Sequence, residues 1–81
     1  MSKIYLAEHC YCIYESGFFA LSAHKTIRGA REAMRNSIKR EWTRNGNKEQ
    51  PFHNAKKEDM WFDDHAFQHQ RWRVRGVILK D

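Results

Sequence analysis

The sequence of 81 residues lacks the features that mark several protein classes. It has one proline, and its four glycines are isolated, so it contains no glycine-rich loop of the kind that cradles phosphate groups. No apolar run approaches the roughly 20 residues that span a bilayer, and no signal-peptide pattern occurs. We therefore expect one domain, residues 1–81, in a cytoplasmic protein that does not cross a membrane.

Cysteine is also scarce, and Cys10 and Cys12 are too close in sequence for an ordinary disulfide within one strand. We expect reduced thiols, as in a reducing compartment. Together with His65 and His69 they could supply four ligands to Zn²⁺, although cysteines in structural zinc sites are usually spaced differently. His9 precedes Cys10, but adjacent strand residues point to opposite faces, so no activated thiol is expected unless a bulge intervenes. The sequence thus predicts a protein that is not an enzyme and needs no cofactor.

The clearest element is a helix predicted over Ser22–Arg44. Its apolar residues recur at steps of three and four, the period of one helix face. They are Ala23, Ile27, Ala30, Met34 and Ile38. Ser22 is a favourable N-cap, because its hydroxyl can accept a hydrogen bond from an unpaired N–H of the first turn. At the other end, Asn45-Gly46 offers a residue that tolerates the left-handed conformation that closes helices.

A second line of side chains follows the apolar one, turned by about 100° around the helix axis. It comprises His24, Arg28, Arg31, Arg35, Lys39 and Trp42. Residues 23–44 carry seven Lys or Arg against two Glu, and the rest of the chain has eight of each sign, so this segment holds the whole formal net charge of +5. A field concentrated on one element favours an anionic partner. The alternative is that this line is only the solvated side of an amphipathic helix.

The segment before the helix predicts a β-hairpin. Residues 3–7 alternate and are rich in strand formers, and the pattern continues to Tyr14 with a bulge or bend expected at His9-Cys10. The turn signal is Glu15-Ser16-Gly17, and Phe18–Leu21 resumes an apolar strand. The second strand should lead directly into the helix.

Beyond the helix, residues 45–57 predict a mobile loop, and residues 58–67 fit either a short strand or one turn of helix. Arg71–Leu79 alternates cleanly and predicts a C-terminal strand. The element order predicts an α+β fold with a small antiparallel or mixed sheet and the helix packed on one face.

Arg71, Arg73 and Arg75 form a second basic row on one side of that strand, with Trp72 between them. Guanidinium groups bind phosphate in a bidentate manner and exposed aromatics stack on bases, so this row would suit nucleic acid if it shared a surface with the helix line. The alternative is cross-strand pairing with the acidic residues between 58 and 64. No helix-turn-helix, RNP or zinc-finger signature occurs, so any nucleic-acid binding should lack base-specific readout.

Residues 3–34, KIYLAEHCYCIYESGFFALSAHKTIRGAREAM, and the later WRVRGVIL resemble small accessory proteins of bacteriophages and mobile elements, including anti-CRISPR inhibitors, in size and element order. The resemblance carries no functional residue across. It implies an inhibitor in the host cytoplasm that occludes a protein or nucleoprotein surface, since a basic chain does not imitate DNA.

We therefore predict a small non-enzymatic binding protein that docks on a host protein or nucleoprotein complex through the basic helix face. The expected contacts are Arg28, Arg31, Arg35, Lys39, Trp42 and Arg44. Trp42 or Trp61 would be the buried anchor of the interface. A free-standing, sequence-nonspecific nucleic-acid-binding regulator is the alternative. Small size and exposed strand edges also make a homodimer an open alternative to a monomer.

Overall fold

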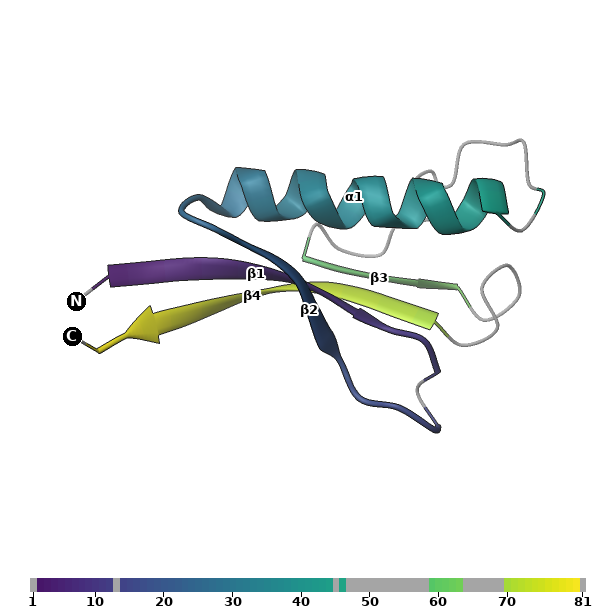
Figure 1. Cartoon of the computed structure of the whole chain (residues 1–81), viewed down its shortest axis with the longest axis horizontal. Coiled ribbons are helices and arrows are strands. Elements are labelled where there is room, and N and C mark those ends of the chain that lie inside the picture. The colour runs from purple at the N-terminus through teal and green to yellow at the C-terminus, as the bar shows by residue number, and fades with distance from the viewer. Residues whose placement is uncertain (1, 13, 45, 47–58, 64–69, 81) are drawn as a thin grey trace.

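The computed structural model describes residues 2–12, 14–44, 46, 59–63 and 70–80. It has an α+β fold in which the helix α1 (Ile27–Arg44) packs against one face of a four-stranded sheet (Figure 1). The strands are β1 (Ser2–Cys10), β2 (Phe19–His24), β3 (Met60–Asp63) and β4 (Gln70–Leu79), in the spatial order β2-β1-β4-β3. All three pairings are antiparallel, which confirms the predicted fold class.

The sheet is built around the central pair β1 and β4. Their register begins with Ser2 opposite Leu79 and continues without irregularity along the whole of β1. On its other side β1 pairs with β2, and there the register shifts between Ala7 and Glu8, which is a β-bulge. The irregularity that the sequence predicts at His9-Cys10 therefore lies slightly earlier, and β1 itself is longer than the alternating segment suggests.

The start of the helix differs from the sequence prediction. Ser22 lies in β2, and α1 begins only at Ile27, so Ser22 is not the N-cap. Thr26 has that role, because its hydroxyl oxygen accepts a hydrogen bond from the N–H of Gly29 at 3.1 Å. Ala23, which fits the helical period, is instead exposed on β2. Pairing with β1 stabilises these residues as a strand, a tertiary interaction that the helical period does not contain.

The remaining boundaries are close to their predictions. Gly46 has a φ of 81° and its N–H donates to the carbonyl of Thr43 at 2.9 Å, so it closes the helix as Asn45-Gly46 predicts. Within the ambiguous segment 58–67, residues 60–63 form the strand β3. β4 begins one residue before the predicted strand. The predicted loop at 45–57 lies, apart from Gly46, outside the described residues.

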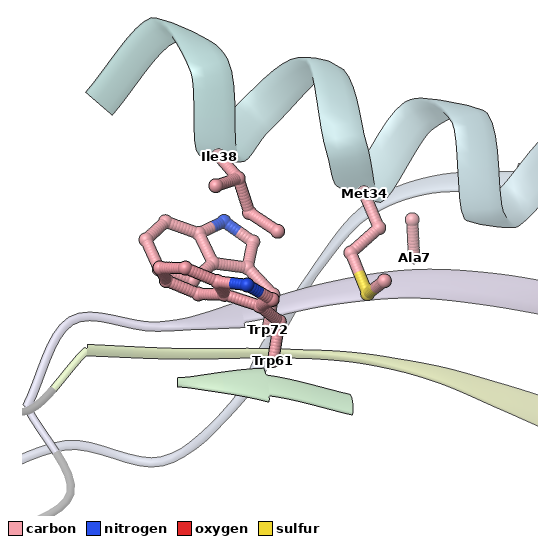
Figure 2. Packing of buried hydrophobic residues seen from close by; sticks show 5 residues of the cluster. All are labelled: Ala7, Met34, Ile38, Trp61 and Trp72. Atoms are coloured by element: carbon pink, nitrogen blue, oxygen red, sulfur yellow. The ribbon is translucent and has the colours of Figure 1, made fainter. Parts of the chain in front are cut away.

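The core lies between α1 and the sheet (Figure 2). Its buried cluster consists of Ala7, Met34, Ile38, Trp61 and Trp72. Trp61 and Trp72 come from neighbouring strands and meet edge-on with their ring centroids 5.7 Å apart. The indole N–H of Trp72 donates to the hydroxyl of Ser37 on the helix at 2.9 Å, which satisfies the polar atom that this ring buries. The predicted apolar face of the helix is confirmed at Met34, Ile38 and Ala30. None of the described helical residues makes a segment long and apolar enough to cross a membrane.

Candidate functional site

The side of α1 that is turned away from the sheet is strongly basic. We call it the outer helix face, and it consists of the exposed residues Arg28, Glu32, Arg35, Asn36, Lys39, Arg40, Thr43 and Arg44. It contains five cations and one acid. A helix turns by about 100° per residue, so burial of Met34 and Ile38 against the sheet leaves these positions toward solvent. Arg28, Arg35 and Lys39 lie within about 40° of one another around the helix axis, so an anionic surface could approach these three cations from one side.

Arg31 differs from the other predicted contact residues on this helix. Its side chain is 25% exposed, and its Nε donates to the Asp59 carboxylate at 2.6 Å. Arg28, Arg35, Lys39 and Arg44 do lie on the outer helix face. Arg31 thus connects the helix to the residue just before β3, and Asp59 pairs with the helix rather than with an arginine of β4.

The two predicted aromatic anchors belong to the core region. Trp42 is half-buried and packs against the core cluster. Trp61 is 1% exposed, which leaves no surface for a partner. Trp42 follows the buried Ile38 by one helical turn, and residues four apart lie on the same side of a helix. The sequence places Trp42 in line with the basic residues but cannot show that this line borders the core.

The second basic row lies on the other side of the sheet from α1. Trp72 faces the helix, so its neighbour Arg73 and then Arg75 point to the opposite side, which we call the far sheet face. There Arg73 Nε donates to Glu8 at 2.6 Å and Arg75 Nη2 donates to the other Glu8 oxygen at 3.2 Å. The guanidinium of Arg73 also stacks on Phe18, 3.9 Å from the ring centroid. The two basic rows therefore do not form one continuous patch.

Glu8 decides the electrostatics of the far sheet face. Its side chain is only 5% exposed, and both of its oxygens accept hydrogen bonds from arginine. A buried carboxylate is stable when it is paired and hydrogen-bonded in this way. The positive charge of these arginines is therefore partly neutralised within the protein, which weakens its attraction for an external anion.

His9 and Cys10 are buried on opposite faces of β1. The His9 ring stacks on Trp72 at 4.2 Å with an 8° tilt, and its Nε2 hydrogen-bonds to Gln70 Oε1 at 2.6 Å. Burial lowers the pKa of His9 below its ordinary value of 6.5, so the ring is neutral at neutral pH. The Cys10 thiol donates to the carbonyl of Ser16 at 3.3 Å. Neither side chain is placed to activate the other, as their adjacency in a strand predicts.

The structure describes two of the four residues of the zinc alternative. Cys10 is buried and Cys12 is half-buried, and both are free thiols. His65 and His69 lie outside the described residues. Within the described part of the chain, no group of three or more histidine, cysteine or acidic side chains is gathered as a metal site.

Exposed aromatics beside the hairpin are a feature that the sequence reasoning did not single out. Tyr11 and Phe19 are 51% and 40% exposed and stack on each other, with ring centroids 5.4 Å apart. Tyr14 is 76% exposed. Their only sequence signal is that aromatics flank the predicted turn on both sides.

The described site thus offers a basic helix face and, on the far sheet face, a buried carboxylate whose two oxygens both accept hydrogen bonds from arginine. No protein-family model, no curated protein and no solved structure matches this chain.

Proposed function

We propose that this chain is a small non-enzymatic binding protein that docks through the outer helix face onto an anionic surface of a protein or nucleoprotein complex. The observation that carries the proposal is the difference between the two sets of arginines. Those of the far sheet face are held by Glu8, whereas Arg28 and Arg35 are exposed on a helix that is fixed to the core. Cations in such a position steer encounter and fix orientation.

The ion pair of Arg44 with Glu41 leaves the outer helix face basic. Arg44 Nη1 lies 3.5 Å from the Glu41 carboxylate, and the side chains of Arg44 and Glu41 are 75% and 14% exposed. A long contact to a largely exposed guanidinium contributes little and is screened by salt. When docking of an acidic partner surface displaces water from these cations, the attraction between the opposite charges becomes stronger than it is in bulk water. Such docking would occlude the partner surface, and we propose a host defence complex as the partner because the chain resembles anti-CRISPR proteins in size and element order.

The test is capture of the partner with a charge-reversed helix. Arg28→Glu/Arg35→Glu changes two exposed residues two helical turns apart and leaves the Arg31–Asp59 pair intact. The matched control is Lys3→Glu/Lys80→Glu, which makes the same change in net charge at two exposed lysines away from the helix. We expect the wild-type protein and the control to retain partners from a native-host lysate, and the helix variant to lose them. Equal retention by the three proteins, with unchanged circular dichroism, would refute the proposal.

The nucleic-acid alternative is distinguished in the same experiment. Treating the lysate with nuclease should leave capture of a protein partner unchanged, whereas a nucleic-acid-binding regulator would lose its captured material. A direct assay of fluorescent duplex DNA and single-stranded RNA complements it. Binding that falls steeply with salt for the wild type, and is absent for the helix variant, would favour the alternative.

A further inference from the structure

One edge of the sheet is only partly covered. β3 pairs with residues 70–73 of β4, and β4 continues to Leu79 (Figure 1). Along residues 75–79, β4 pairs with β1 on one side, and none of the described strands pairs with it on the other. We call this stretch the open edge. An unpaired strand edge is a template for another strand.

The hydrogen bonds of neighbouring residues show which backbone groups the open edge presents. The N–H of Val74 donates to the carbonyl of Asp59 at 2.9 Å, so the polar groups of Val74 point toward the β3 side. Backbone direction alternates along an antiparallel strand. The N–H and C=O groups of Gly76 and Ile78 therefore point outward at the open edge, and those of Val77 point toward β1.

The side chains of the open edge do not protect it. Ile78 and Leu79 are large apolar residues, and they are 60% and 42% exposed. Proteins commonly block edges with charged side chains, especially lysine, with proline or with a bulge. Among residues 75–79 only Arg75 is charged, and it is paired with Glu8; the segment contains no proline, and its pairing with β1 has no bulge.

We propose that the open edge pairs with the open edge of a second copy of this chain, antiparallel and with the two-fold axis at Val77. In this register Gly76 lies opposite Ile78 of the second copy, and Ile78 lies opposite its Gly76. These are the residues whose backbone groups point outward, so the two pairs form four intermolecular hydrogen bonds. An axis at Gly76 would instead need the N–H of Val74, which already donates to Asp59.

Shape makes a second copy suitable for this edge. Gly76 has no side chain, and a Cβ there would meet Lys3 Cε at 2.6 Å and lie 3.6 Å from the Tyr5 ring. The Lys3 side chain thus lies over the bare backbone of Gly76, and its aliphatic stem offers an apolar contact to the exposed Ile78 of the second copy. In a symmetric pair, this contact between Gly76 of one copy and Ile78 of the other forms twice.

Charge also favours this contact over others between two basic chains. In the proposed register Arg75 lies opposite Leu79, not opposite a second arginine, and its charge is paired with Glu8. The aliphatic stem of Arg75 can cover part of the exposed Leu79. Contact through the outer helix faces would bring five cations of each copy together and would be repulsive.

A cysteine crosslink tests the register. The variant Val77→Cys, made in a Cys12→Ser background, should form an intermolecular disulfide under mild oxidation, because facing residues of a pair that is not hydrogen-bonded have Cα atoms about 4.5 Å apart. The matched control Ile78→Cys should not, since the two copies of residue 78 would lie about 8 Å apart, beyond the reach of a disulfide. A crosslink at 78 but not at 77, or at neither position, would overturn the proposal.

Proline substitution tests, without engineered cysteines, whether the open edge is needed for dimerisation. Ile78→Pro removes an N–H that points outward and leaves the ladder with β1 intact, so sedimentation should change from dimer to monomer. Ala23→Pro is the matched control, because the same alternation places the Ala23 N–H on the outer edge of β2. It should remain a dimer. A wild-type protein that sediments as a monomer at the crosslinking concentration, or an Ile78→Pro variant that folds and remains a dimer, would refute the pairing.

Discussion

The outer helix face and the far sheet face both carry arginine, in different surroundings. On the far sheet face, Arg73 and Arg75 share the buried carboxylate of Glu8, and Arg73 also stacks on Phe18. On the outer helix face, Arg28 and Arg35 are exposed. The comparison teaches that a count of basic residues does not locate a binding surface. What matters is whether the fold already supplies each cation with an acid.

The largest expected effect comes from removing that acid. Glu8→Gln preserves the shape of the side chain but removes its charge, so Arg73 and Arg75 lose their ion pairs. Because both arginines are partly exposed, we expect a loss of about 2 kcal/mol in the free energy of unfolding, less than the roughly 3–5 kcal/mol for breaking a fully buried pair. Urea denaturation measures it.

The matched control makes the same chemical change on the outer helix face. Glu32→Gln replaces an exposed carboxylate and should change the free energy of unfolding by less than about 0.5 kcal/mol. Glu8→Gln should also elute from a heparin column at a higher salt concentration than Glu32→Gln, because the substitution releases two arginines from their pairing with Glu8. Equal effects of the two variants on stability would mean that Glu8 does not set the two faces apart.

The next effect is a pH dependence from His9, the residue beside Glu8. Burial lowers the pKa of His9, and the hydrogen bond to Gln70 and the charge of Glu41 oppose part of this shift. The unfolded chain therefore binds the proton first as the pH falls. The stabilising contribution of neutral His9 to the free energy of unfolding should be fully present above pH 6.5. As the pH falls from 6.5 through the folded-state pKa, this contribution should be lost, by at most about 1.4 kcal/mol per pH unit.

This prediction contrasts two neighbouring buried groups. The charge of Glu8 is paired with two arginines, whereas the His9 ring is stacked on the indole of Trp72. Denaturation curves measured between pH 5.5 and 7.5 check it. His9→Phe retains the aromatic stack and lacks the titrating group, so its stability should vary less in this window. A variant with the same pH profile as the wild type would contradict a role for His9.

The smallest effect concerns Arg31, which lies on the same helix as the exposed arginines but is paired. Arg31→Ala should lower the free energy of unfolding by about 0.5–1 kcal/mol, because its partner Asp59 is 47% exposed and solvent screens the pair. Arg35→Ala is the control on the outer helix face and should change it by less than about 0.5 kcal/mol. Thermal denaturation distinguishes the two. A larger loss for Arg35→Ala would show that the outer helix face contributes to stability.

Much of the fold follows from local sequence patterns. The three-four spacing of Met34 and Ile38 indicates the buried helix face, and the alternation around Trp72 indicates β4. The boundary at Ser22 is wrong in the sequence prediction because residues 22–24 satisfy both the helical period and strand pairing. Only the partner strand β1 decides between them.

The candidate site is less predictable, because its electrostatics depend on pairs far apart in sequence. Glu8 and Arg73 are separated by 65 residues, and Arg31 and Asp59 by 28. Counting charges along the sequence does not show that these residues pair. Trp42 shows the same limit for packing, since its distance from the core depends on how the helix is rotated against the sheet.

The pairing of β1 with β4 also determines the order in which this fold can be completed during synthesis. When residues 2–44 have emerged from a ribosome, the hairpin of β1 and β2 and the helix are present, but Trp61 and Trp72 are not. The nascent chain therefore lacks the two tryptophans that pack with Met34 and Ile38 until β4 arrives beside β1. Closure over so long a stretch of chain is slow compared with local folding. The time between translation of β2 and of β4 is thus when this protein is most open to aggregation or to chaperones.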